Sequence, residues 1–230
     1  MKINSFFKLQ LNKKQHVEHS LVQKVKFFVL SYFFALTSMF ILMLFVTMPI
    51  DFFIMKVLHF ESIEKIMNPL QNSNVNYPFY LVVFIGPFFE EILFRLGLII
   101  NRRNISIFLG VLIFEILGGS ITTFSLTNSS SIYFAIIGLA SMFLSCFYLP
   151  KQALEFLNKH KSYLIRFSIL FFGLLHISNA SEFHWQLALF YPFFVIPQIV
   201  MAYFITNLRL KYGFFWGLGL HIVFNAISYI

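Results

Sequence analysis

Long uncharged apolar runs, separated by short polar segments, dominate this sequence of 230 residues. Hydrophobic residues make up 59% of the chain and charged residues only 11%, whereas about 25% of the residues in a typical soluble domain are charged. Several runs reach the roughly 20 residues that a helix needs to cross a hydrocarbon core of about 30 Å. The sequence therefore predicts an all-α fold, a polytopic membrane helix bundle.

Seven runs are long enough to form transmembrane helices, and together they use up most of the chain. The predicted spans are residues 22–50, 78–100, 105–123, 132–149, 162–179, 186–206 and 212–230. We expect a polar loop beginning at Asp51, part of which (residues 52–67) lies along the membrane interface. A basic segment with Lys151 is expected to connect the fourth and fifth spans, and residues 207–211 to join the last two. This arrangement leaves no room for a large soluble domain.

The basic residues give the predicted bundle an orientation. With the N-terminus in the cytoplasm, residues 1–21 form a basic cytoplasmic arm, and only Lys56 and Lys65 of the 17 Lys and Arg residues lie in outer loops. Arg95 lies within the second span, and the other basic residues lie on the cytoplasmic side, where Lys and Arg are enriched. We therefore predict a multi-pass protein of the cell membrane. Its short loops are typical of proteins of the bacterial cytoplasmic membrane.

The formal charge of +8 does not indicate a nucleic-acid partner. The basic residues lie in short segments between apolar runs, and the sequence has neither a Gly-rich phosphate loop nor a basic and aromatic cluster. The single cysteine, Cys146, lies in an apolar run, so an intrachain disulfide is not possible. Composition thus predicts the lipid bilayer as a partner and leaves the oligomeric state open.

Two adjacent glutamates, Glu90 and Glu91, lie in the middle of the second span, and Arg95 follows about one turn later. An ionisable side chain at mid-bilayer costs about 2.5–3.5 kcal/mol on insertion scales. Glu91 and Arg95 are four residues apart and can pair on one helix face, whereas Glu90 points about 100° away from Glu91. A structural ion pair that fixes helix packing explains Glu91 and Arg95, but it does not explain Glu90.

Later spans add further polar sites. His176 lies near the end of the fifth span, while His221 and Asn225 are four residues apart in the seventh and share one face. A lone membrane histidine is often an interhelical hydrogen-bonding group, and that interpretation is sufficient for His176 alone. Together with the glutamates, these side chains could hold and deprotonate a water and stabilise an oxyanion. Glu115, in the third span, is a further acid that could line the same cavity or pair with Arg95.

Three motifs, each in its own span, carry a family resemblance: Glu-Glu-x-x-x-Arg at 90–95, Phe-x-x-x-His at 172–176 and His-x-x-x-Asn at 221–225. In this order they resemble the motifs of the CPBP family of intramembrane proteases, also called Abi. That family includes CAAX prenyl-protein endopeptidases and bacteriocin-processing or immunity proteases. The resemblance implies a catalytic membrane domain over residues 78–230, preceded by the basic arm (1–21) and by the first transmembrane helix with its interfacial loop (22–77).

The resemblance also implies a role for each motif position. Glu90 with His176 would hold and activate the attacking water, and His221 with Asn225 would stabilise the oxyanion of the tetrahedral intermediate. The neighbouring Glu–Arg ion pair would orient the first two groups. The implied reaction is hydrolysis of a peptide bond in a peptide or a membrane-anchored protein.

The need for a metal is left open. Glu90, His176 and His221 could supply the three protein ligands that a catalytic zinc usually has, and the family is described both as metal-dependent and as a glutamate-type peptidase. The sequence contains no His-Glu-x-x-His helix, and Asn225 is a natural oxyanion donor. These observations favour a mechanism without a cofactor and keep zinc as the alternative.

Two other classes of function fit parts of the pattern. A non-catalytic membrane partner, such as a bacteriocin immunity protein or a regulator of a sensor kinase, would act by binding. A proton-coupled transporter would use intramembrane acids and histidines as a proton relay. The sequence shows no paired halves with broken helices at corresponding positions, which argues against the transporter.

Overall fold

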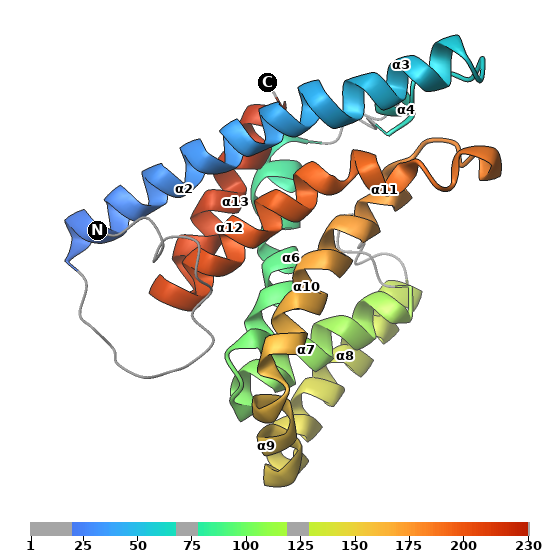
Figure 1. Cartoon of the computed structure of the whole chain (residues 1–230). Coiled ribbons are helices and arrows are strands. Elements are labelled where there is room, and N and C mark those ends of the chain that lie inside the picture. Colours follow the sequence, from blue (N-terminus) through green and yellow to red (C-terminus); the bar gives the residue numbers. More distant parts are fainter. Residues whose placement is uncertain (1–19, 68–77, 119–128, 230) are drawn as a thin grey trace.

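The computed structural model describes residues 20–67, 78–118 and 129–229, and all the regular elements in these ranges are helices (Figure 1). The predicted all-α fold is therefore confirmed for the described residues. The first helical stretch consists of α2 (Leu21–Leu42), the π-helical turn η1 (Met43–Thr47) and α3 (Met48–Lys56). The second region comprises α4 (Ile63–Ile66), η2 (Leu81–Ile85), α6 (Gly86–Arg95), η3 (Leu96–Leu98) and α7 (Arg102–Ile116). The remaining elements are α8 (Ser129–Tyr148), α9 (Lys151–Lys159), α10 (Lys161–Leu175), η4 (His176–Asn179), η5 (Trp185–Leu187), α11 (Tyr191–Phe194), α12 (Ile196–Tyr212) and α13 (Phe214–Tyr229).

Among the described residues, three helical stretches are long and apolar enough to cross a membrane. They are Leu21–Lys56, Ser129–Tyr148 and Lys161–Asn179, and Phe214–Tyr229 is a shorter apolar helix. This finding indicates a membrane protein. The seven spans and the cytoplasmic N-terminus stay predictions, and most of the predicted basic arm, residues 1–19, lies outside the described residues.

Two predicted connections contain helices in the structure, and at the first of them the predicted boundary was wrong. The first helix continues through Asp51 to Lys56, where we expected a polar loop. The carboxylate of Asp51 is buried and accepts hydrogen bonds from the Ser62 hydroxyl and the Ile63 amide, at 2.7 and 2.8 Å. The Asp51 carboxylate therefore binds the residues at the start of α4. The basic segment between the fourth and fifth spans likewise forms α9.

The predicted sixth span, residues 186–206, is not one helix either. Pro192 and Pro197 lie in the first turns of α11 and α12, where a missing N–H costs little and the ring favours a helix start. The helix α12 then extends through the expected connection at 207–211 and ends at Gly213, whose φ of 104° is readily adopted by glycine. Prolines thus move this helix towards the C-terminus relative to the prediction.

The main core surrounds α12, which contacts α2, α10 and α13. Figure 1 shows the long first helix lying across α12 and α13, with α7, α8 and α9 on the opposite side of the molecule. Small residues allow close helix crossings, as is common in membrane bundles. At Gly173 of α10, an added Cβ would collide with the Ile199 side chain of α12, and at Gly110 it would lie 2.8 Å from the Gly138 carbonyl oxygen. The first crossing joins α10 to α12, and the second joins α7 to α8. Further contacts of α6 with α10 and α13 complete the group of helices around the polar residues.

Candidate active site

Glu90 and Glu91 lie on α6, a ten-residue helix that follows the π-helical turn η2. Their side chains differ in burial, because adjacent helical residues point about 100° apart. The Glu91 side chain is fully buried, whereas that of Glu90 is 36% exposed. The sequence-based expectation that the two carboxylates face different surroundings therefore agrees with the geometry.

A buried network joins α6 to α12 and α13. The Arg95 guanidinium contacts the Glu91 carboxylate at 2.5 Å, and both side chains are completely buried. Arg95 also donates from Nε to the Thr206 hydroxyl of α12 at 3.3 Å. On the other side, Nδ1 of His221 lies 2.9 Å from the same Glu91 oxygen. Glu91 thus binds one cation on its own helix and one imidazole on α13.

His221 lies between the two glutamates. Its Nε2 is 3.4 Å from the Glu90 carboxylate, and its side chain is only 1% exposed. Because the Glu91 carboxylate accepts from Nδ1, the neutral imidazole has no hydrogen on Nε2. The contact with Glu90 is then favourable only if a proton resides on Nε2 or on Glu90. Glu90 and His221 are therefore placed so that one proton can pass between them.

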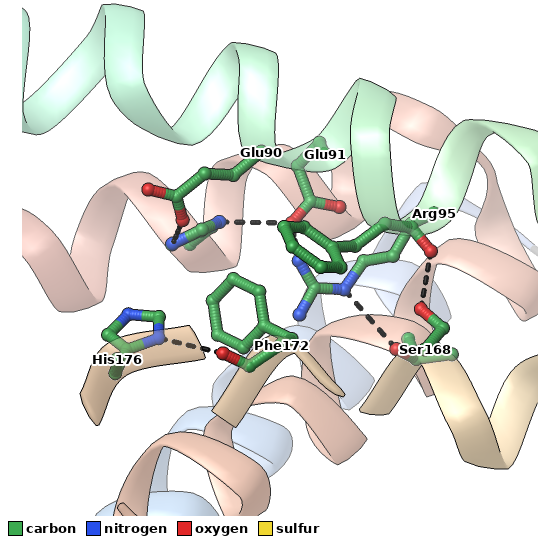
Figure 2. Close-up of polar contacts among 9 residues, drawn as sticks. Glu90, Glu91, Arg95, Ser168, Phe172 and His176 are labelled. Atoms are coloured by element: carbon green, nitrogen blue, oxygen red, sulfur yellow. Dashed lines mark hydrogen bonds and ion pairs between the residues drawn. The ribbon is translucent and has the colours of Figure 1, made fainter. Parts of the chain in front are cut away.

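The second histidine, His176, is held differently. Its Nδ1 lies 2.8 Å from the Phe172 carbonyl oxygen, and since a carbonyl only accepts, Nδ1 carries a hydrogen. Figure 2 shows the Phe172 ring between the imidazole of His176 and the guanidinium of Arg95. The ring centroid lies 4.7 Å from the His176 ring, 5.7 Å from the His221 ring and 4.2 Å from the Arg95 carbon Cζ. The Phe172 ring thus separates His176 from the buried network.

A cavity of about 950 Å³ lies beside this network, between α6, α7 and α10. Glu90, Glu115 and His176 line it, whereas His221 and Asn225 do not. Most of its other lining residues are apolar, and two of them, Phe167 and Phe171, are 61% and 42% exposed. The cavity therefore reaches the apolar surface of the bundle.

Asn225 is bonded away from the cavity. Its side-chain Nδ2 donates to the carbonyl oxygen of Val82, in the π-helical turn η2, at 2.9 Å. Asn225 and His221 lie one turn apart on α13 and share a face, and α13 packs against both η2 and α6. This face of α13 therefore holds the second predicted span at two separate places.

Arg209 adds a further positive charge, beyond the predicted sixth span. It is 3% exposed, and its guanidinium lies 4.8 Å from the Phe214 ring centroid. The guanidinium of Arg209 and the buried carboxylate of Glu91 attract each other electrostatically.

The residues suggested for zinc do not form a three-ligand site. Both ring nitrogens of His221 contact carboxylates, and His176 lies across the Phe172 ring. Within the described ranges, no group of three or more His, Cys, Asp and Glu side chains could hold a metal ion. The positions of Glu90, His176 and His221 therefore do not fit the zinc alternative.

The structure thus brings four of the six predicted site residues into one network, namely Glu90, Glu91, Arg95 and His221. It places His176 across the Phe172 ring, on the wall of the cavity that Glu90 also lines, and ties Asn225 to the adjacent turn. Sequence reasoning missed two hydroxyls that support it: Thr206, which binds Arg95, and Ser168, which donates to the Phe94 carbonyl. The only feature of the sequence that could have indicated these two residues is that each is polar within an apolar segment. Sequence reasoning also missed Pro87, which has no N–H to donate at the start of the helix that carries the glutamates.

The sequence matches no protein-family profile, and comparisons with curated proteins and with solved structures likewise found no match.

Proposed function

We propose that this chain is an intramembrane endopeptidase of the CPBP type, with seven spans and a cytoplasmic N-terminus in a bacterial cell membrane. One observation carries the proposal: a carboxylate, Glu90, lies on the wall of a large apolar cavity and 3.4 Å from Nε2 of a buried histidine, His221. A structural ion pair does not require Glu90 on that wall. The substrate class is an apolar peptide, or the membrane segment of an anchored protein, that enters from the bilayer.

In the proposed reaction, Glu90 is the general base. When Nε2 of His221 carries a proton, the Glu90 carboxylate is ionised and takes a proton from a water in the cavity. The water oxygen attacks the scissile carbonyl carbon, and a tetrahedral oxyanion forms. Glu90 then returns the proton to the amide nitrogen, the C–N bond breaks, and the products are a carboxylic acid and an amine.

His176 and His221 have different tasks in this scheme. His176 keeps Nε2 available, because Nδ1 is bound to a carbonyl, so Nε2 can accept the second hydrogen of the attacking water. His221 holds Glu90 and provides the positive charge that keeps it ionised. To act as oxyanion donors, His221 and Asn225 would have to leave their present partners, Glu91 and the Val82 carbonyl.

The test uses purified protein in lipid nanodiscs and a library of quenched-fluorescent peptides with apolar residues around the scissile bond. Replacing Glu90→Gln should reduce cleavage by roughly 100-fold or more, since general bases contribute about 10²–10⁴-fold. Glu182→Gln is the matched control, because Glu182 is 79% exposed and lies outside the cavity. Undiminished cleavage by a folded Glu90→Gln protein contradicts the proposal.

A non-catalytic membrane partner is the second candidate. It is favoured by the way in which Glu91, Arg95, His221 and Asn225 bind one another, a hydroxyl or a backbone carbonyl, as packing residues do. Here the replacement of Glu90, His176 and His221 together should leave the cellular phenotype of the gene intact. Loss of that phenotype in stable protein supports the peptidase instead.

The proposed topology has its own test. In a Cys146→Ser background, Ser20→Cys should react with a membrane-impermeant maleimide only after cells are opened, and Glu182→Cys should react in intact cells. Ser20 lies at the predicted cytoplasmic end of the first span, and Glu182 lies in the predicted outer loop between the fifth and sixth spans. The reverse pattern would exclude a cytoplasmic N-terminus.

A further inference from the structure

The turn that precedes Glu90 has a gap in its backbone hydrogen bonds. In η2, the Gly86 N–H donates to the Leu81 carbonyl, five residues earlier, which is the π-helical pattern. In the same register, the next bond would run from the N–H of residue 87 to the carbonyl of Val82. Residue 87 is a proline and has no N–H.

Asn225 supplies the missing donor. Its Nδ2 lies 2.9 Å from the Val82 carbonyl oxygen, within normal hydrogen-bond distance. Inside an apolar bundle, a carbonyl without a partner costs free energy because no water replaces the lost bond. The amide of α13 therefore takes the place that a backbone N–H would have in an uninterrupted helix.

The consequence for Glu90 follows from its position. Glu90 comes three residues after Pro87, within one helical turn of the interrupted register. A π-helical turn changes the rotation of all the residues that follow it, so the register of η2 decides which way Glu90 and Glu91 point. On α13, the residue one turn before Asn225 is His221, which contacts both glutamates.

We propose that Asn225 is a positioning residue: its amide replaces the N–H that Pro87 lacks and thereby fixes the rotation of α6 that turns Glu90 to the cavity and Glu91 to His221. The catalytic meaning of that rotation rests on the proposed function, but the rotation itself does not. The competing role for Asn225 is that of an oxyanion donor, which acts only during a reaction.

A double-mutant experiment separates the two roles. Asn225→Ala should lower cleavage of the quenched peptides about 100-fold, because small misplacements of reacting groups have effects of this size. Adding Pro87→Ala restores a backbone N–H beside the Val82 carbonyl, and the double variant should recover most of the loss. An oxyanion donor cannot be replaced in this way, so an unrescued double variant overturns the proposal. If Asn225→Ala alone does not fold, the amount of folded protein is compared instead. Recovery of folded protein in the double variant then counts as the rescue.

A second readout requires no substrate. Dicyclohexylcarbodiimide modifies protonated carboxyls in apolar surroundings, so it reacts with Glu90 during the time in which Glu90, and not Nε2 of His221, carries the proton. Peptide mapping quantifies the adduct on Glu90, with Glu90→Gln as the assignment control. Asn225→Ala should slow this labelling as Glu90 leaves the cavity wall, and Pro87→Ala in addition should restore it. Labelling of Asn225→Ala at the wild-type rate contradicts the positioning role.

The two readouts also distinguish failure of this inference from failure of the proposed function. Labelling that follows the expected pattern, in a protein that cleaves none of the peptides, supports the positioning role and counts against the peptidase. Pro49→Ala is the matched control, because Pro49 follows the other π-helical turn, η1, and should leave Glu90 labelling unchanged.

Discussion

Two π-helical turns in the described part of the chain are each followed by a proline, and they differ in how they are held. In η1, the Met48 N–H bonds to the Met43 carbonyl and Pro49 follows; in η2, the Gly86 N–H bonds to the Leu81 carbonyl and Pro87 follows. The local cause is thus the same, because each proline removes one donor from the helix. Bends of this kind are tolerated in membrane helices when other groups satisfy the backbone.

The surroundings of the two turns are different. In η1, Phe45 is 75% exposed, and the Thr47 hydroxyl bonds back to the Met43 carbonyl of its own helix at 3.1 Å. Among the described residues, no side chain from another helix bonds to η1. The η2 turn packs against α13 and receives the Asn225 amide. Within the described ranges, only the turn that leads to the glutamates therefore receives a side-chain hydrogen bond from a second helix.

The largest expected effect concerns the ion pairs beyond these turns. Arg95→Ala leaves the Glu91 charge buried without its guanidinium partner and should lower the free energy of unfolding by about 3–5 kcal/mol. The variant for comparison is Lys65→Ala, which breaks the ion pair between Glu61 and Lys65. These residues are also four apart, but their side chains are 71% and 61% exposed. That change should cost at most about 1 kcal/mol. Unfolding in mixed micelles measures both, and equal losses would remove the distinction between the regions.

A smaller effect is expected from removing the side-chain hydrogen bonds at the turns themselves. Asn225→Ala should cost about 1–3 kcal/mol in unfolding free energy, because it leaves the Val82 carbonyl without a donor. Thr47→Val should cost less than about 1 kcal/mol, since the Met48 N–H still bonds to the Met43 carbonyl. The same micelle titration gives both values. A larger cost for Thr47→Val would show that η1 depends on its side chain more than η2 does.

The smallest effect is expected from Pro49→Ala. This change restores an N–H in the exposed turn without disturbing a contact between helices, so stability should rise or stay within about 1 kcal/mol. Turnover of the peptide library should equal that of the wild-type protein. A loss of turnover would mean that the bend at η1 reaches the cavity, which contradicts the separation of the two regions.

Much of the helical architecture could be predicted from periodicity and apolarity alone. The second predicted span is helical over residues 81–98, and its crossing of a membrane stays a prediction. The pairing of Glu91 with Arg95 and the different direction of Glu90 were predicted correctly, because both follow from spacing within one helix. The errors lie where prolines and capping groups act. The predicted sixth span breaks before α12, and the loop expected at Asp51 is helical because that carboxylate binds Ser62 and Ile63.

The sequence by itself determined the helical class, the apolar surface and the three polar motifs, since these depend on residue type and on 3.6-residue periodicity. Only the tertiary structure decided the partners. It placed His221 between the glutamates, His176 beyond the Phe172 ring and the Asn225 amide on the Val82 carbonyl. Contacts between helices depend on how each helix is rotated and packed against its neighbours. The spacing of residues within one helix does not determine that rotation or packing.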